Sequence, residues 1–452
     1  MAAVSQILAT TIFLAMFAAI ISGKTHRYIP ALIGGALMIT VVFLLIMKSP
    51  TSVANVLNFS QLGQPKFWLP GEEQVKSHGV NWQTIIFIAG MMILVEGLSK
   101  VGFFRWMCLH VARLVNYQVL PILIAFMILS GFLAMFIDSI TVLLFLASVT
   151  IELGRLLKFD PVPVIIAEIF AANVGGSATM CGDPPNIIIG TAFGYTFTDF
   201  VINTGPIAWA GMFVSIVYFY ICARRTLTTT ATSSQSQDRY PSPSEAVANP
   251  QLFWLLTAIF CLVVVLLITH AETGLSVAAI GVIATILTLM ASWKESISIA
   301  KRLDWRTLLF FIGLFVCVGG LEETGVLGTL ANYIGEVSGG QITIVIPIIL
   351  WMSAFASAIV DNIPFAATMV PVISSLSYSA GLSLPTLSWT LALGTDIGGN
   401  ATPIGASANV VGTAIAEREG YPIAWGRFLK YALPAAILVL ALCHLLLVLR
   451  YT

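Results

Sequence analysis

Two short polar sequences interrupt long apolar regions of the chain, and each begins with an aspartate. The sequence DSIT at 138–141 lies within the apolar region 120–157, and DNIP at 361–364 lies within 343–378. A carboxylate between two apolar arms is suited to bind Na⁺ or to carry a proton. Such arms predict a re-entrant helical hairpin, whose freed backbone groups at the tip need water or a ligand. The alternative is a pair of ordinary spans with the aspartate in a surface turn.

Two longer apolar segments are also interrupted by polar sequences, NVGGSATMCGDPPN at 173–186 and DIGGNATPIGASAN at 396–409. In each, a glycine pair can end one half-helix, and a capping residue, Asp183 or Ser407, can begin the next. A helix broken within the membrane offers carbonyl groups at one end and N–H groups at the other, which suits ion binding. A packing kink held by Gly and Pro is the alternative. Two copies that both carry several polar residues favour a binding role.

Three glutamates lie in apolar surroundings. Glu168 lies about one helical turn before Asn173, so it is a candidate proton carrier; a buried structural carboxyl is the alternative. Glu152 stands three residues before Arg155, which predicts a local ion pair on one helix face. Glu96 is close to the end of a span, where its carboxylate can reach the interface or a hydrogen bond.

The composition places these motifs in a membrane protein. Of 452 residues, 58% are hydrophobic and 9% are charged, and the mean hydropathy is +0.95. Soluble domains carry about 25% charged residues, so a soluble enzyme, a disordered chain and a nucleic-acid-binding protein are excluded. Apolar stretches of about 17–25 residues recur along the whole chain, as in polytopic helical membrane proteins, and the alternating strands of a porin-like barrel are missing.

We expect ten spans or broken spans in addition to the paired arms at 120–157 and 343–378. A further helix at 103–117 is amphipathic and is expected to lie in the membrane interface. The expected spans are 4–22, 28–47, 80–98, 163–195, 199–222, 252–269, 275–292, 304–320, 385–415 and 428–449.

The two halves of the chain align with each other. The polar, Ser/Thr-rich stretch 226–250 predicts a flexible linker between a first repeat, 1–225, and a second repeat, 251–452. Five spans and one paired-arm region per half make the repeats inverted in the membrane. A shift of 223 residues, without a gap, places Asn81-Trp82 on Asp304-Trp305, Gly90 on Gly313, Gly97 and Gly102 on Gly320 and Gly325, Asp138 on Asp361, Gly175-Gly176 on Gly398-Gly399, Ala178-Thr179 on Ala401-Thr402, and Asn186 on Asn409.

The charged residues predict an orientation and a cationic ligand. With alternating crossings, 17 of the 21 Lys and Arg residues fall on one side, and only Lys48, Lys66, Lys76 and Arg450 fall on the other. The basic side is expected to be cytoplasmic, which places both termini outside a plasma membrane. Every base then lies in a loop or at a segment end, whereas four aspartates lie in the core. An acidic core without bases favours binding of Na⁺ or H⁺. The core aspartates are Asp138, Asp183, Asp361 and Asp396.

These motifs resemble those of the ion transporter superfamily that includes the ArsB/NhaD permeases, and they look closest to its melanosomal P protein branch. The resemblance is carried by GGSATMCGDPPN at 175–186, DNIPFAATMVP at 361–371 and GGNATPIGASANVV at 398–411. It implies a scaffold and a mobile transport part in each protomer, often in a homodimer, with elevator-like alternating access. Related dicarboxylate carriers have Ser-Asn-Thr at the hairpin tips. The aspartate found here argues against dicarboxylate transport, and the ASANVV ending argues against arsenite.

The resemblance also implies that the binding site lies between the hairpin tips and the broken-helix loops. Its residues would be Asp138, Ser139, Thr141, Asp361 and Asn362 at the tips, and Asn173, Ser177, Thr179, Asp183, Asn186, Asp396, Asn400, Thr402, Ser407 and Asn409 in the loops.

The leading hypothesis is a secondary active transporter, similar to a sodium/proton antiporter, that couples a small ion or solute to Na⁺ or H⁺. Asp138 and Asp361 would bind the cation or proton. The alternatives are an anion, arsenite or carboxylate permease of the same fold, whose substrate is held by half-helix N-termini, and a passive ion channel. An enzyme is not expected, because no nucleophile–base or metal-ligand pair has suitable spacing. No cofactor is expected besides the coupling ion, and no partner besides the lipid bilayer, the solute and a second copy.

Overall fold

The computed structural model describes residues 2–69, 79–228 and 240–452, and every regular element in these ranges is a helix. Ten of the described helices are long and apolar enough to cross a membrane. The number is eleven if the bent pair Val277–Ala291 and Trp293–Lys301 counts as one span. The prediction of an all-α polytopic membrane protein is therefore confirmed. Residues 229–239 of the predicted linker lie outside the described residues.

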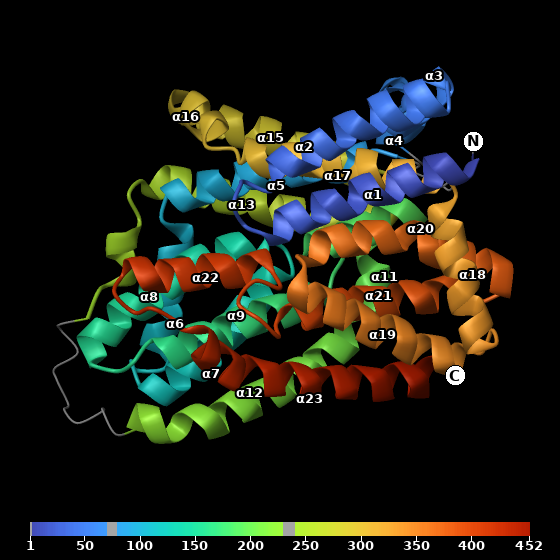
Figure 1. Ribbon diagram of the computed structural model, residues 1–452. Coiled ribbons are helices and arrows are strands. Elements are labelled where there is room, and N and C mark those ends of the chain that lie inside the picture. Colours follow the sequence, from blue (N-terminus) through green and yellow to red (C-terminus); the bar gives the residue numbers. More distant parts are fainter. Residues whose placement is uncertain (1, 70–78, 229–239) are drawn as a thin grey trace.

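The helices form two layers, which Figure 1 shows one above the other. The short elements of the first layer are α3 (Pro50–Leu57), η2 (Phe59–Gly63), α4 (Pro65–Trp68), α14 (His270–Thr273), η5 (Trp293–Glu295) and α16 (Ser296–Lys301). Its long helices are α1 (Ala2–Ile21), α2 (Tyr28–Leu37) with its π-helical continuation η1 (Met38–Ile46), α5 (Trp82–Lys100), α13 (Pro250–Ile268), α15 (Val277–Ala291) and α17 (Trp305–Glu323).

The second layer holds the paired arms and the broken helices (Figure 1). Two helices, α6 (Phe103–Leu114) and α18 (Val326–Ser338), connect the layers at opposite ends of the molecule. The second layer consists of α7 (Val119–Ala134), α8 (Ser139–Leu157), α9 (Val162–Gly176), α10 (Pro184–Phe193), α11 (Phe197–Asn203), α12 (Gly205–Thr228), α19 (Ile342–Ile359), α20 (Asn362–Ala380), α21 (Leu384–Gly399), α22 (Ser407–Arg418) and α23 (Trp425–Tyr451), with η4 (Pro243–Ala246) beside α6.

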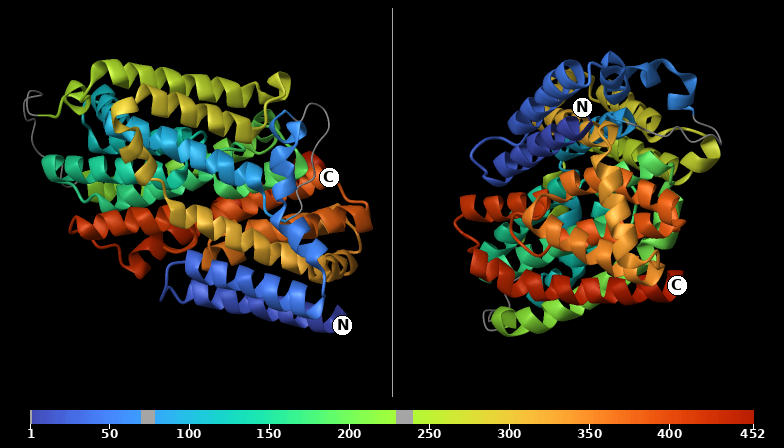
Figure 2. Two further views of the ribbon diagram at one scale, coloured as in Figure 1. Left: turned by 90° about the horizontal axis from the view of Figure 1, so that it is seen from above. Right: turned by 45° about the vertical axis from the view of Figure 1, so that its right-hand side comes forward.

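The first layer is built from helices of both halves of the chain. Helices α1 and α2 pack on α17, and α5 packs on α15 and α13. Seen from above in Figure 2, these two groups lie on opposite sides of the layer. Each group therefore combines helices from both predicted repeats.

Glycines permit the closest crossings in both groups. A Cβ atom at Gly90 would lie 2.2 Å from the carbonyl oxygen of Gly281, and one at Gly313 would lie 2.5 Å from the carbonyl carbon of Ala31. Gly90 and Gly313 are equivalent under the 223-residue shift. Small residues at both positions let the helix backbones touch, as is usual inside membranes.

Most predicted segments are confirmed, with one correction. The segments 163–195 and 385–415 are each two helices separated by a loop, as expected. The segment 199–222 is instead the short helix α11 followed by α12.

Two predictions about single residues are also corrected. The residue that caps α22 is Ala406, and Ser407 is the first helical residue. Glu152 does not pair with Arg155; its carboxylate accepts two hydrogen bonds from Arg105 of α6 at 2.7 and 2.8 Å.

The glycine contact predicts a stability defect. Gly90→Ala should lower the free energy of unfolding by about 1–3 kcal/mol, because the new methyl group meets backbone that cannot move aside. Thermal unfolding of the purified protein in detergent measures this change. The matched control is Gly328→Ala in α18, where a Cβ atom meets nothing within 4 Å. Equal unfolding temperatures for the two variants would contradict the role of Gly90.

Candidate functional site

Each broken helix is attached to the neighbouring paired arms by its loop. In the loop 177–183, the Thr179 hydroxyl donates to the Met135 carbonyl at 2.5 Å. In the loop 400–406, the Thr402 hydroxyl donates to the Ala358 carbonyl, also at 2.5 Å. All four positions correspond under the 223-residue shift. The contact therefore recurs in both halves of the chain.

At each loop, the side-chain amide of an asparagine donates hydrogen bonds to backbone carbonyls. The amide nitrogen of Asn186 donates to the carbonyls of Gly176 and Thr179, both at 3.1 Å. The amide nitrogen of Asn409 donates to the carbonyls of Gly399 and Thr402 at 2.8 and 2.6 Å. These carbonyls lie at or just after a helix C-terminus, where they have no partner within the helix. The asparagines thus allow a helix to end inside an apolar protein.

The two broken helices are bonded directly to each other. Asn173 of α9 donates to the side-chain oxygens of Asn400 and Asn409, both at 2.9 Å. Asn186 donates to a carboxylate oxygen of Asp396 in α21 at 2.9 Å. All these side chains are at most 1% exposed. The structure therefore brings together loop residues that are more than 200 positions apart in the chain.

Two buried carboxyl groups lie at the centre of this arrangement. Asp183 is 4% exposed and Asp396 is fully buried, and they lie close enough for the charge of each to act on the other. Asp183 also accepts from both helix-pair tips, from Asn362 at 2.6 Å and from Ser139 at 3.3 Å. In the described residues, neither carboxylate forms an ion pair with a base. Two buried carboxylates that lie close together repel each other when both are charged, so this arrangement favours a bound proton or cation.

Several polar atoms next to these bonds have no protein partner. They include three side-chain oxygens, which are the atoms that a hard cation prefers, and their burial makes each one costly unless a ligand or water meets it. The unpartnered atoms are Oδ1 of Asn173, Oδ1 of Asn186, Oδ1 of Asp396 and Nδ2 of Asn400.

Arg27 corrects the expectation of an acidic core without bases. It stands just before α2, and its guanidinium donates to Asp361 at 2.5 Å and to the Ser407 hydroxyl at 2.8 Å. It also lies over the ring of Phe310, 5.2 Å from the centroid. The side chains of Arg27 and Asp361 are 29% and 14% exposed. One of the two equivalent aspartates therefore already has a cationic partner.

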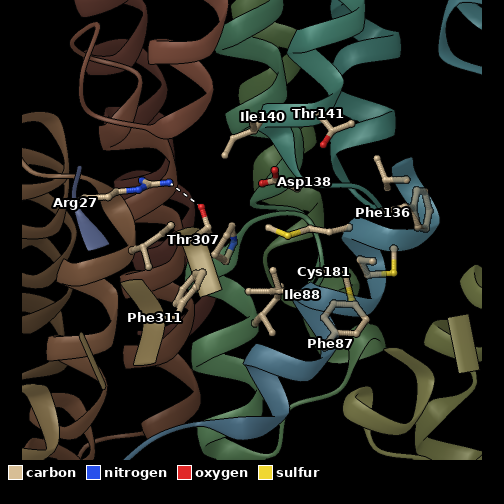
Figure 3. A pocket seen from close by; sticks show the side chains of 16 residues that line it. Arg27, Phe87, Ile88, Phe136, Asp138, Ile140, Thr141, Cys181, Thr307 and Phe311 are labelled. Atoms are coloured by element: carbon tan, nitrogen blue, oxygen red, sulfur yellow. Dashed lines mark hydrogen bonds between the residues drawn. The ribbon is translucent and has the colours of Figure 1, made fainter. Parts of the chain in front are cut away.

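A cavity of about 50 Å³ lies between the two layers, with room for only a few water molecules. Figure 3 shows Asp138 in it, facing Arg27 and Thr307 from the opposite wall; Arg27 donates to Thr307 at 3.4 Å. Most of the lining is apolar. The first layer contributes Arg27, Phe87, Ile88, Met91, Met92, Val95, Thr307 and Phe311, and the second contributes Phe136, Asp138, Ile140, Thr141, Cys181, Pro184, Ile187 and Ile363.

The remaining candidates lie apart from this centre or play a local role. Glu168 is fully buried in α9 and accepts a hydrogen bond from Thr150 of α8, while its Oε2 atom has no partner. It bonds none of the other candidates, so its role as a proton carrier stays a prediction. Ser177 donates to the Val174 carbonyl within its own helix end. Within the described residues, no group of three or more His, Cys, Asp or Glu side chains is placed to hold a metal ion.

Sequence reasoning missed Arg27, although the sequence carries a signal for it. A base directly before a helix is unfavourable, because the N-terminal end of the helix dipole is positive. Such a residue is expected to face an acid elsewhere, but the acid, Asp361, is 334 residues away.

Broken helices whose polar loops face each other inside an apolar helical protein define a membrane transporter. Within that class, the chain belongs to the citrate transporter family, CitMHS, whose sequence model matches residues 17–394. The resemblance to the ion transporter superfamily is thereby confirmed.

Relatives of this chain are found in bacteria and in animals. A "46 kDa membrane protein" of Mycobacterium leprae is 32% identical over 453 residues and covers 99% of both chains. An uncharacterized transporter of Mycobacterium tuberculosis is 31% identical over 449 residues, again with 99% of both covered. The P protein of Homo sapiens is 29% identical over 471 residues, which include 83% of this chain and 55% of the P protein. The expected likeness to the P protein is therefore present.

Two solved structures share the fold. The YdaH transporter of Alcanivorax borkumensis superposes with a TM-score of 0.61 over 98% of this chain and 97% of its own, at 14% identity. The MtrF efflux pump of Neisseria gonorrhoeae gives 0.55 over 94% and 93%, also at 14% identity. These likenesses establish the architecture, while the family is established by the sequence matches.

The loop asparagines predict a second stability defect. Asn186→Leu should destabilise the protein by about 1–3 kcal/mol, because the buried Thr179 carbonyl is left unpaired and the Gly176 carbonyl keeps only the 3.4 Å bond from the Thr179 N–H. The unfolding temperature in detergent measures the loss. Ser148→Ala is the control, because its exposed hydroxyl bonds only the Leu144 carbonyl of its own helix. A fully stable Asn186→Leu protein would show that water can replace the amide.

Proposed function

We propose that the chain is a secondary active transporter that couples the movement of a small ion or solute to H⁺ or Na⁺. The observation that supports this most directly is the burial of Asp183 and Asp396 close together within one hydrogen-bond network, in which Asn362 and Ser139 donate to Asp183 and Asn186 donates to Asp396. Each aspartate comes from a different broken helix, and no base among the described residues is bonded to either. A proton or a monovalent cation is what such a pair needs to stay buried.

Loading of the coupling ion would control the shape of the site. Asp183 accepts from Asn362 and Ser139, one residue from each helix-pair tip, and Asp396 accepts from Asn186. With a shared cation these bonds hold the two tips and the two loops together. Without it, the two carboxylates repel each other and the same elements separate. Coupling then follows, because only the loaded centre is compact enough to move.

The proposed movement is an elevator-like displacement of the second layer past the first. The cavity between the layers is mostly apolar, and besides the contacts of Arg27 the polar bonds that sliding must break include those of Thr191 in α10 with Asn81 and Thr84 of the first layer. Helices α6 and α18 connect the layers at opposite ends and would act as hinges. Two inverted repeats, each with a re-entrant hairpin and a broken helix, remain part of this proposal.

A carboxylate permease is the second candidate, and Arg27 favours it. The cavity contains this guanidinium opposite Asp138, and guanidinium groups bind carboxylates through paired hydrogen bonds. The description of the family as citrate transporters points to the same substrate class. Because Asp361 is engaged by Arg27, Asp138 is the better of the two tip aspartates for the predicted Na⁺ site. An arsenite permease and a passive channel have no comparable support.

Proton or sodium coupling is tested in proteoliposomes. An imposed pH or Na⁺ gradient should drive uptake of a probe from a panel of citrate, succinate, phosphate and arsenite. Asp183→Asn and Asp396→Asn should each reduce gradient-driven uptake at least about tenfold, because a neutral amide needs no cation. Asp138→Asn should reduce uptake if Asp138 binds Na⁺.

Glu152→Gln is the matched control, since that carboxylate is paired at the edge of the second layer. Full gradient-driven uptake by both Asp183→Asn and Asp396→Asn would contradict the proposed coupling site. Uptake with equal rates in the presence and absence of any gradient would favour the channel.

The charge distribution predicts the orientation in a plasma membrane, with both termini outside. A tag after Thr452 should therefore react with an antibody in intact cells, and a thiol introduced at exposed Lys294 should be labelled only after the membrane is permeabilised. The reverse pattern would show that the topology is inverted.

A further inference from the structure

The contacts of Arg27 resemble those of a binding site that one of the protein's own side chains occupies. The Oδ2 atom of Asp361 accepts from Arg27 at 2.5 Å and from the Ser407 hydroxyl at 2.9 Å. Arg27 donates to Ser407 as well, and to Thr307. A guanidinium and one hydroxyl group thus contact the same carboxylate oxygen, and the Thr307 hydroxyl accepts from the other arm of the guanidinium. Charge-assisted bonds of this kind are the strong ones in carboxylate recognition.

The equivalent tip of the first repeat is built without these donors. Asp138 precedes α8 as Asp361 precedes α20, but among the described residues no base forms an ion pair with Asp138. The position equivalent to Ser407 under the 223-residue shift is Pro184, which has no hydroxyl. The tip therefore folds without an arginine and a serine. Their presence in one repeat calls for a role beyond stabilising the turn.

The pair also connects the two layers. Arg27 belongs to the first layer and Asp361 to the second. In the described part of the chain the other five ion pairs join elements of one layer, or join α6 to α8. These are Lys100–Glu295, Arg302–Glu96, Arg105–Glu152, Arg155–Glu419 and Arg427–Asp160. An elevator movement would leave those five intact and would have to break the Arg27–Asp361 pair.

We propose that Arg27 is the residue that binds a carboxylate of the substrate, and that Asp361 occupies it as a built-in competitor while the substrate is absent. This inference rests on the carboxylate candidate described above. A substrate carboxylate that reaches the cavity displaces Asp361 from Arg27 and Ser407. The same exchange removes the ion pair between the layers, so substrate binding frees the second layer to move. Partial exposure of both side chains allows the exchange without unfolding.

If Asp361 competes with the substrate for Arg27, removing the charge of Asp361 and removing the charge of Arg27 should change the carboxylate affinity in opposite directions. Purified full-length protein in detergent is titrated with citrate, succinate or acetate at constant ionic strength, and affinity is measured by calorimetry. Asp361→Asn should bind the carboxylate about tenfold more tightly, because the competing charge is gone. Arg27→Gln should bind it at least about tenfold more weakly. Arg27→Lys should fall between wild type and Arg27→Gln, since it keeps the charge but not the two-pronged geometry.

The matched controls are Arg105→Gln and Glu152→Gln, which break an ion pair of similar length outside the cavity. Both should leave the affinity unchanged. A purely structural ion pair would make Arg27→Gln and Asp361→Asn weaken binding alike, and that result would overturn the proposal. So would wild-type protein that binds none of the three probes.

A second measurement covers the case in which one variant folds poorly. In a protein whose other cysteines are replaced, Cys181 in the cavity wall reports access. Its reaction with N-ethylmaleimide should speed up when citrate is added to wild type, and Asp361→Asn should react fast without citrate. An unchanged rate in both would contradict the exchange. These binding measurements need no gradient and leave Asp183 and Asp396 intact. A failure of the Arg27 proposal is therefore distinguishable from a failure of the proposed coupling, because either test can succeed without the other.

Discussion

A helix that ends inside an apolar layer leaves carbonyl and N–H groups without partners, and this constraint organises the centre of the protein. Water is scarce there, so the partners must come from side chains. Asn186 and Asn409 meet the carbonyls of their own loops, and Thr179 and Thr402 bond the loops to the neighbouring arms. Once these bonds are made, several buried polar atoms of the same side chains still have no protein partner. The proposed binding centre is thus a consequence of how the two breaks are stabilised.

The two halves of the chain solve this problem in the same way but differ in charge. The position of Asp183 is occupied by Ala406 in the second half, and the position of Asp396 is occupied by Asn173 in the first. The two carboxylates therefore come from different halves, whereas an alanine and an asparagine fill the corresponding places. Two carboxylates bind one cation or proton; four would repel, and none would bind. The two halves share the framework, but each contributes only one of the two aspartates, and this difference sets the charge of the centre.

Most of the architecture could be predicted because it depends on local patterns. Apolar length gives the spans, and the Gly pairs with Asp183-Pro184-Pro185 mark the breaks. The 223-residue register even identified the equivalent contacts. The layers could not be predicted, because the packing of α2 on α17 and of α5 on α15 depends on backbone approach at glycines. Arg27 was assigned to a loop, since its position in the sequence does not show that its side chain reaches Asp361.

The location of Arg27 changes how the charges in this protein are to be understood. Bases in loops and acids in the core favour Na⁺ or H⁺ binding, and they leave only the half-helix N-termini for an anion. A guanidinium between the layers instead puts groups of opposite charge on the two walls of the cavity, with Arg27, which is paired with Asp361, on one wall and Asp138 on the other. The Asp183–Asp396 centre lies beyond it, within the second layer. An anionic solute and a coupling cation then need not share a site. In the proposed transporter the solute binds at Arg27 and the cation at the aspartates, and the hydrogen bonds between the tips and the loops connect the two sites.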